Sequence, residues 1–145
     1  LTDLPDSFEQ LGATQSNAGR MAKAGVKVAI NAATMQNPRR LQQVAGNLVA
    51  LTRVPGASGL AWGKAFAAIS SVPAEISGMG DKAGVLKAGA LGDVVIWDGD
   101  PLEAGSVPSA VYIGGVKQDL TSHQSRLRDR YKSLDESRLP KAYDW

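Results

Sequence analysis

The sequence predicts an α/β fold, and three patterns along its 145 residues lead to this prediction. Near the start, a helical pattern, a glycine and a short β-branched run follow one another, as in units that build parallel sheets. Residues 94–97 form an uninterrupted apolar run whose residue types favour a strand. Two further β-runs flank Gly114-Gly115, which is typical of a hairpin with a primed turn.

The first predicted helix begins at Asp6 or Ser7, either of which can cap it, and ends near Ala24. Its apolar residues recur mostly at spacings of three or four, and Gly25 is placed to end the helix. The segment Val26 to Ile30 then predicts a strand, because three of its residues are β-branched.

Three more helices are predicted in the next part of the chain. Asn37-Pro38 supplies an N-cap and a proline in the first turn, and residues 41–51 follow with amphipathic spacing. An alanine-rich helix is expected over residues 60–70. A short helix over residues 72–76 ends at Gly78-Met79-Gly80.

The second half is organised around Val94-Val95-Ile96-Trp97, which we expect to be a buried strand. Asp98-Gly99-Asp100-Pro101 ends it, because Asp-Gly favours a turn and proline has no N–H for a further ladder bond. The hairpin strands are predicted at residues 109–113 and 116–120. Thr121 or Ser122 caps a last, strongly charged helix that is expected to reach Leu134.

Composition excludes several classes of function. The net charge is only +2 and the basic residues form no long patch outside the last helix, so no nucleic-acid partner is expected. The absence of cysteine excludes disulfides, thiolate nucleophiles and cysteine-based metal sites. No apolar run approaches the ~20 residues that span a bilayer, so no membrane partner is expected.

Residues 84–102, GVLKAGALGDVVIWDGDPL, resemble the C-terminal segment of the amidohydrolase superfamily, close to its imidazolonepropionase-like and prolidase-like members. The segments at residues 24–30, 37–48 and 72–80 extend the likeness. Residues 122–131, SHQSRLRDRY, are similar to the ending of a secreted bacterial subgroup, with His123 in place of an arginine.

The resemblance implies the C-terminal fragment of a (β/α)8 metal-dependent hydrolase barrel, followed by the closing strands of a small β-sandwich. It implies the last barrel units and helices at residues 1–80, sandwich strands and the hairpin at residues 81–120, and a C-terminal helix and tail at residues 121–145. The charged helix is then expected to be solvated and to lie over the sandwich.

The activity implied by the resemblance is hydrolysis of C–N bonds in amides and cyclic amides, with a divalent metal such as zinc. Members of the family hold the metal with a His-x-His pair, further histidines and often a lysine. This chain has one histidine in total, so it cannot supply that ligand set. We therefore expect no metal ligand and no cofactor in this chain, and no activity of the chain alone.

The family's proton-shuttling aspartate falls near Thr34, with Asn31 or Ala33 as alternatives, in the loop that follows the predicted strand at residues 26–30. A threonine cannot carry the proton as a carboxylate does. Two explanations stay open: the alignment slips, or the site is altered in the full-length relative. No other catalytic residue is predicted, because His123 is interpreted as a surface residue at a helix start.

Asp93, Asp98 and Asp100 lie close together in the sequence and raise the question of a cation site with oxygen ligands. The strand between them places Asp93 at the opposite end from the other two. We therefore interpret all three as carboxylates that form turns.

Three functional hypotheses follow. The first is the C-terminal part of an amidohydrolase-like hydrolase, and the second is a non-catalytic structural or binding module derived from that scaffold. The third, a metal-free enzyme that uses paired carboxylates, finds no support at the strand ends. A partial barrel exposes strand edges and apolar helix faces, so self-association or pairing with the missing N-terminal portion is expected. The resemblance of residues 122–131 to a secreted bacterial subgroup implies a periplasmic or secreted location of the protein.

Overall fold

The structure is a computed structural model, and it describes residue 8, residues 12–32 and residues 37–132. Within these residues it consists of five α-helices, two 3-10 helices and one three-stranded sheet. In chain order the elements are α1 (Asn17–Lys23), η2 (Pro38–Arg40), α2 (Leu41–Ala50), η3 (Leu51–Arg53), α3 (Trp62–Ala67), α4 (Ser71–Ile76), β1 (Val94–Trp97), β2 (Pro108–Ile113), β3 (Val116–Lys117) and α5 (His123–Tyr131).

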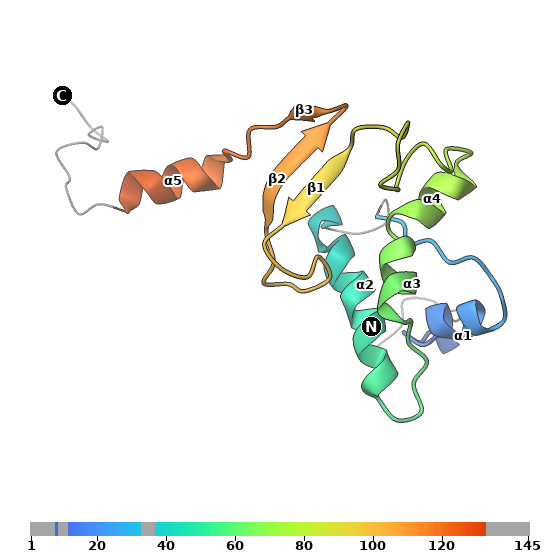
Figure 1. The fold of residues 1–145 in the computed structure, drawn as a ribbon. Coiled ribbons are helices and arrows are strands. Elements are labelled where there is room, and N and C mark those ends of the chain that lie inside the picture. Colours follow the sequence, from blue (N-terminus) through green and yellow to red (C-terminus); the bar gives the residue numbers. More distant parts are fainter. Residues whose placement is uncertain (1–7, 9–11, 33–36, 133–145) are drawn as a thin grey trace.

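The core lies where α2 and α3 run side by side below the sheet (Figure 1). Its buried side chains are Ala45, Leu48, Leu60, Ala65 and Leu102. The alanines on the two helices are fully buried, and such small side chains allow a close helix contact. The Leu60 N–H donates to the Leu48 carbonyl at 2.9 Å, and Leu102 brings the loop between β1 and β2 onto the same core.

The first helix begins later than predicted. Asp6 and Ser7 lie outside the described residues, and α1 begins only at Asn17. Thr14 accounts for this start, because its carbonyl accepts from the Asn17 N–H at 3.1 Å and its hydroxyl accepts from the Ser16 N–H at 3.2 Å, in a turn that competes with a helix. The predicted end is confirmed, since Gly25 has φ +84° and its N–H bonds back to Ala22 at 3.2 Å.

Residues 26–30 do not form the predicted strand within the described part of the chain. The segment has no strand partner among the described residues, and Val26 is exposed. A strand exists only through ladder bonds to a neighbour, and the Ile30 N–H instead donates to the Ala68 carbonyl beyond α3 at 2.9 Å. The β-branched composition correctly indicated apolar character, but it could not supply a pairing partner.

The next three helices agree better with the sequence. The predicted cap of η2 is confirmed, because Asn37 Oδ1 accepts from the Arg39 N–H at 3.1 Å. Helix α2 follows η2 directly, as the amphipathic spacing predicted. Helix α3 is shorter than the predicted range, because the N–H groups of Ile69 and Ser70 and the Ser70 hydroxyl donate in turns to the carbonyls at the helix end. Helix α4 ends at Ile76, and Gly78, with φ +74°, follows shortly after it as predicted.

The sheet has the order β1-β2-β3 with both pairs antiparallel. Gly114 and Gly115 have φ of +58° and +80°, so the predicted primed hairpin turn is confirmed. The register of β1 against β2 shifts between Ile96 and Trp97, at the end where the turn begins. Strand β3 is shorter than the predicted range of residues 116–120.

The expectation that β1 is buried is wrong. Val95 is 44% exposed and Ile96 is 48% exposed, although both are large apolar residues. The two residues point to opposite faces of the sheet, so neither face is fully covered by the described residues. The composition of the strand indicated a buried position, and burial requires packing layers that the described part of the chain does not provide.

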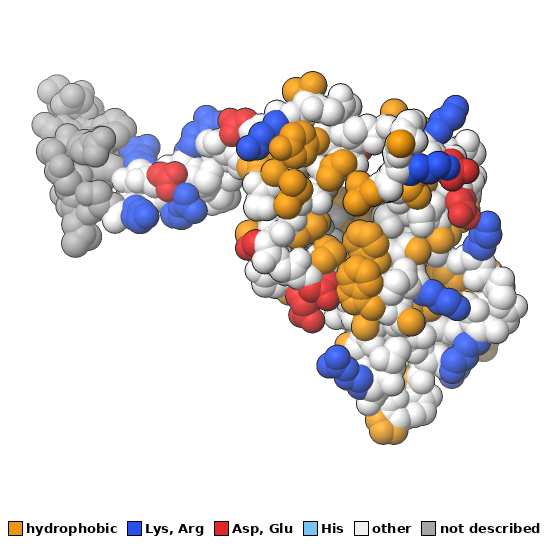
Figure 2. Space-filling model, in the orientation of Figure 1, with side chains coloured by type: hydrophobic (Ala, Val, Ile, Leu, Met, Phe, Trp, Pro, Cys, Tyr) orange, Lys and Arg blue, Asp and Glu red, His pale blue; other side chains and the backbone are white. Residues whose placement is uncertain are grey.

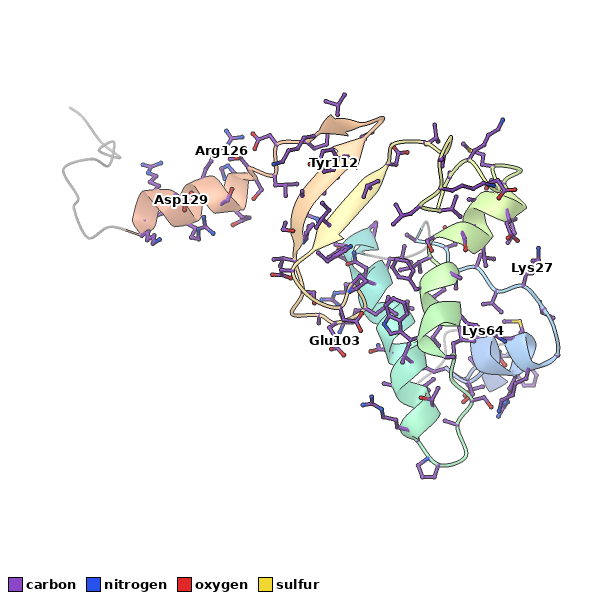
Figure 3. All side chains as sticks on the ribbon, viewed as in Figure 1. Lys27, Lys64, Glu103, Tyr112, Arg126 and Asp129 are labelled. Atoms are coloured by element: carbon purple, nitrogen blue, oxygen red, sulfur yellow. The ribbon has the colours of Figure 1, made fainter. Side chains whose placement is uncertain are left out.

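Helix α5 projects away from the sheet instead of lying over it (Figure 1). Figure 3 shows Arg126 and Asp129 on α5, beyond the sheet and on the far side from Lys27 and Lys64. Ser122 forms the predicted cap, with its Oγ accepting from the Ser125 N–H at 3.1 Å. The predicted extension of this helix to Leu134 lies outside the described residues. The predicted division of the chain into barrel, sandwich and C-terminal parts at residues 80 and 120 stays a prediction.

None of the helices in the described ranges is both long and apolar enough to cross a membrane.

Candidate functional site

An apolar cleft lies between α3 and β1 and has a volume of about 510 Å³. It is lined by Phe66, Ile69, Ser70, Gly84, Val85, Leu86, Asp93, Val94, Val95 and Trp97. Figure 2 shows hydrophobic side chains gathered in the middle of the visible face, between the sheet and the helices, with acidic side chains at their lower edge. The cleft has the size and lining of a binding surface and holds one ionisable group, Asp93.

One wall of the cleft is held by an aromatic pair on α3. The rings of Trp62 and Phe66 stack with centroids 5.2 Å apart and planes 9° apart. Trp62 Nε1 donates to both carboxylate oxygens of Asp100, at 2.9 and 3.0 Å, which fixes α3 to the loop after β1. The bond therefore connects α3, which carries the cleft residue Phe66, to the loop that follows the cleft residue Trp97.

The opposite rim is formed by residues 84–86, and its position depends on Gly84. This glycine has φ +69°, and an added Cβ would collide with the backbone of Ser70. Only glycine combines this conformation with so close an approach, so the rim is fixed against the start of α4.

The three aspartates around β1 serve as turn residues, as predicted. Asp93 Oδ1 accepts from the Gly114 N–H at 2.7 Å, and Asp98 Oδ1 accepts from the Val107 N–H at 2.8 Å. Asp100 Oδ1 accepts from the N–H of the core residue Leu102 at 2.9 Å. Each carboxylate therefore ties a loop or hairpin to an end of β1, and their charges lie at both ends of the strand.

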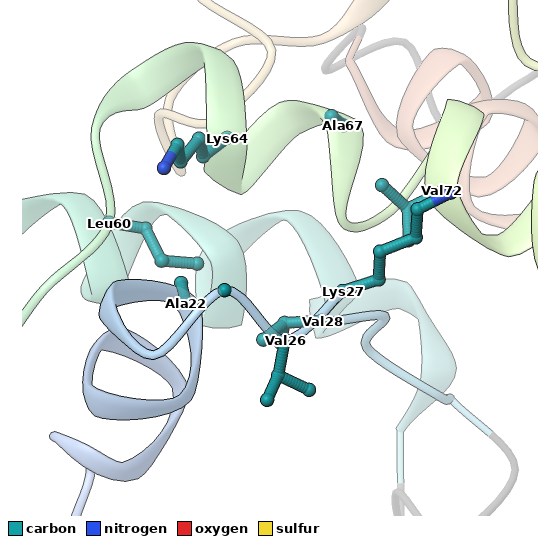
Figure 4. Close-up of a pocket in the computed structure, with 9 residues that line it drawn as sticks. Ala22, Val26, Lys27, Val28, Leu60, Lys64, Ala67 and Val72 are labelled. Atoms are coloured by element: carbon teal, nitrogen blue, oxygen red, sulfur yellow. The ribbon is translucent and has the colours of Figure 1, made fainter.

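A second, smaller cleft of about 230 Å³ lies between the segment at residues 26–28 and α3 (Figure 4). Its walls are mainly apolar, with Val26, Val28 and Leu60 among them. Lys27 and Lys64 also line it, and Lys27 Nζ forms an ion pair with Glu75 at 2.7 Å. Its apolar walls include the segment that was predicted to be a strand.

Most of the predicted catalytic loop lies outside the described residues. Thr34 and Ala33 belong to residues 33–36, so their geometry is not tested. Asn31 is described and is exposed at the end of the extended segment. His123 is exposed and is the first residue of α5, and in that position it fits the interpretation of a helix-start surface residue.

The described residues do not fit the metal that the resemblance implies. Among them, no three histidine, cysteine, aspartate or glutamate side chains come close enough together to hold an ion. The turn bonds of Asp93, Asp98 and Asp100 agree with this, because Asp93 accepts from the hairpin at one end of β1, whereas the other two accept from the β1–β2 loop at the opposite end. The histidine ligand set of the family would have to come from residues that this chain does not contain.

The amidohydrolase family model matches residues 18–116, which is most of the chain. The chain belongs to the amidohydrolase family. This membership confirms the resemblance found in residues 84–102 and makes hydrolase chemistry the family context of the chain. The family is generally metal-dependent.

Two known amidohydrolases agree with the assignment. Amidohydrolase tasK of Hapsidospora irregularis is 43% identical over 60 residues, which are 41% of this chain and 6% of that protein. The crystal structure of an amidohydrolase from Thermotoga maritima matches with a TM-score of 0.68 at 24% identity. That match covers 80% of this amidohydrolase chain and 29% of the solved one, so the chain spans less than a third of its structural relative. The likeness shows the fold: helices and a small sheet arranged as in an amidohydrolase.

Sequence reasoning missed the larger cleft and the bond between Trp62 and Asp100. One signal for the cleft was present, because Val85 and Leu86 are apolar residues in a glycine-rich turn segment with no periodic pattern. The bond joins residues 38 positions apart and left no local pattern.

Proposed function

We propose that this chain is the C-terminal part of an amidohydrolase that hydrolyses C–N bonds in non-peptide or cyclic amides. In this proposal the segment at residues 26–30 is the last strand of a (β/α)8 barrel, and β1, β2 and β3 are closing strands of a small β-sandwich. The catalytic metal, zinc or a similar divalent ion, is held by residues outside this chain, and the chain alone is inactive.

The observation that carries the proposal is that a match over 80% of this chain accounts for only 29% of the solved amidohydrolase. Its segment at residues 26–30 is extended and apolar but has no strand beside it among the described residues. A strand of a closed barrel needs neighbours on both sides, and residues beyond this chain would supply them.

The proposal gives this chain a scaffolding role. The loop at residues 31–36 follows the extended segment and would lie at the carboxyl rim of the barrel, where barrel enzymes carry their catalytic groups. Thr34 is the proposed position of the family's proton-shuttling aspartate. The apolar surface left around residues 26–30 would be covered by the remaining polypeptide or by a second copy.

The test compares the 145-residue chain with a longer polypeptide that includes the upstream coding sequence. Both are assayed for hydrolysis of N-acyl amino acids and cyclic amides, and the bound metal is measured on the same samples. We expect hydrolysis and bound metal only in the longer polypeptide. Hydrolysis by the 145-residue chain alone would contradict the proposal, if the rate is unchanged after further purification and after metal ions are removed with a chelator.

A non-catalytic module is the alternative, and the single histidine of the chain favours it. The same experiment separates the two functions. A longer polypeptide that binds no metal and hydrolyses none of the amides, yet folds with this chain, would support the module. A periplasmic or secreted location is part of the proposal only through the subgroup resemblance, and fractionation of the source cells checks it.

A further inference from the structure

We propose that α5 of one copy of this chain docks into the apolar cleft between α3 and β1 of a second copy. The contact would be an interaction surface separate from the proposed catalytic rim. Helix α5 also lies beyond residues 18–116, the part that matches the family model, so the shared family activity gives it no role.

The cleft supplies an apolar floor beside β1, and negative charge lies at both ends of that strand, although Asp93 is the one carboxylate that lines the cleft. Leu86 at its rim is 85% exposed, and Val95 and Trp97 contribute strand side chains. Asp93 lies at one end of β1, and Asp98 with Asp100 lies at the other. None of these three carboxylates forms an ion pair within the described part of the chain.

Helix α5 presents the complementary pattern. Leu127 and Tyr131 are one turn apart and share a face, and Tyr131 is 59% exposed. Arg126 flanks this apolar stripe, and the Arg130 guanidinium lies over the Tyr131 ring, 5.3 Å from its centroid. Neither arginine forms an ion pair with any described residue. Residues 123–132 contain four basic residues against one acidic residue, Asp129.

The dimensions of the two surfaces agree. The nine residues of α5 span about 13.5 Å. The four residues of β1 span about 13 Å, with an aspartate just beyond each end. A helix laid along β1 therefore brings basic side chains within reach of both acidic ends while the stripe covers the cleft floor.

A copy cannot easily fill its own cleft. Helix α5 follows β3, the strand at the far edge of the sheet, whereas the cleft lies beside β1 at the other edge (Figure 1). The helix points away from the body, and only residues 118–122 connect it to β3. The cleft of a second copy is not limited by the short connection between β3 and α5. In a two-fold dimer each copy would place its α5 in the cleft of the other.

Cysteine cross-linking tests the contact directly, because the chain has no native cysteine. Gln124→Cys lies on the same face of α5 as Leu127, and Leu86→Cys lies on the cleft rim. Mixing the two single variants and oxidising them is expected to give a disulfide-linked heterodimer, identified by the mass of its linked peptides. Val54→Cys is the control partner, because Val54 is 50% exposed and does not line the cleft.

Charge reversal tests the electrostatic part of the contact. Arg126→Glu with Arg130→Glu is expected to raise the dimer dissociation constant at least about tenfold in sedimentation experiments, because attraction becomes repulsion at exposed pairs. Arg39→Glu with Arg40→Glu makes the same change in net charge on exposed η2 and is expected to leave the constant unchanged. Added salt is expected to weaken the wild-type dimer.

Several results would overturn the contact. The first is a wild-type chain that stays monomeric at its highest soluble concentration. The second is an unchanged dimer dissociation constant after charge reversal at Arg126 and Arg130. The third is equal cross-linking of Gln124→Cys to Leu86→Cys and to Val54→Cys. Loss of the cross-link when upstream amidohydrolase residues are present would assign the cleft to that polypeptide instead. None of these results bears on the hydrolysis assay, so the proposed function stands or falls separately.

Discussion

At the scale of single residues, Asp81 combines an unusual backbone with a charged partner. Its φ of +64° lies in the left-handed region, which aspartate tolerates better than most residues. Lys87 Nζ bonds its Oδ1 at 2.8 Å, and this hydrogen bond, with the charge of Lys87, holds the pKa of Asp81 below its usual 3.8. The pair closes the loop that leads to the cleft rim at residues 84–86.

The pH dependence of this pair can be measured. Because the folded pKa is lowered, the stabilisation is present above pH 3.8 and is lost as the pH falls through the folded pKa. Lys87→Met is expected to bring the pKa of Asp81 back toward 3.8, as followed by the carboxyl carbon signal in NMR titrations. Lys82→Met serves as the control and should leave the pKa lowered. An unchanged titration after Lys87→Met would show that the contact is not formed in solution.

Gly84 provides a second prediction at this scale. Gly84→Ala places a Cβ against the Ser70 backbone and forces a side chain into φ +69°, so a loss of about 1–3 kcal/mol in unfolding free energy is expected. Gly63→Ala is the matched control in α3, where the added Cβ meets no atom within 4 Å. It should stabilise the chain by about 0.5–1 kcal/mol, because alanine is the better helix former. Urea unfolding measures both, and equal effects would contradict the close approach.

At the scale of elements, α5 depends on its cap. Ser122 and Ser125 form a capping box, in which each side chain bonds the backbone of the other residue. Helix α5 has no large packing partner among the described elements, so its helix content should depend strongly on this cap.

Ser122→Ala is therefore expected to cost about 1 kcal/mol of helix stability. The measurement is the set of Cα chemical shifts of residues 123–131, which should move toward random-coil values. Gln124→Ala is the control, because it leaves the box intact and replaces an exposed residue by a strong helix former. Helical shifts that persist after Ser122→Ala would mean that another contact, such as the proposed docking, holds the helix.

Local signals were predictable from the sequence and long-range ones were not. The Asn37 cap, the Gly25 terminator, and the Gly114-Gly115 turn each depend on a few adjacent residues, and all three form as predicted. The strand at residues 26–30 and the burial of β1 depend on partners far along the chain or outside it. The residue pattern of a segment indicates which secondary structure it favours, whereas strand pairing and burial also depend on which neighbouring segments are present.

The same distinction explains the site. The aspartates near β1 were interpreted correctly as turn residues, but only the bond from Leu102 to Asp100 is a local Asx turn. The bonds that Asp98 and Asp93 accept come from residues 9 and 21 positions along the chain. The larger cleft joins α3, the segment at residues 84–86 and β1, and the bond between Trp62 and Asp100 that holds it spans distant positions. Thr34 lies outside the described residues, so the position of the family's aspartate stays a prediction.

At the scale of the whole molecule, much apolar surface is open. The buried core consists of a few small or medium side chains, and no large side chain is fully buried among the described residues. Large apolar residues from Val26 to Tyr131 are exposed along the described chain. Monomeric proteins rarely leave such surface uncovered, because burying it is the main force that stabilises a fold.

This excess of exposed apolar surface over buried core predicts how the chain behaves alone and as part of the longer polypeptide of the proposed function. The 145-residue chain should bind a hydrophobic dye such as ANS and unfold at low urea concentration, since its small core offsets little of the entropy of folding. The longer amidohydrolase polypeptide should bind far less dye per chain and unfold with a steeper urea dependence, because more surface is exposed on unfolding. A self-associating 145-residue chain should lose dye binding as its concentration rises, whereas a monomer should not. Equal dye binding by both polypeptides would mean that the upstream residues do not cover these faces, and the barrel assignment of residues 26–30 would then fall.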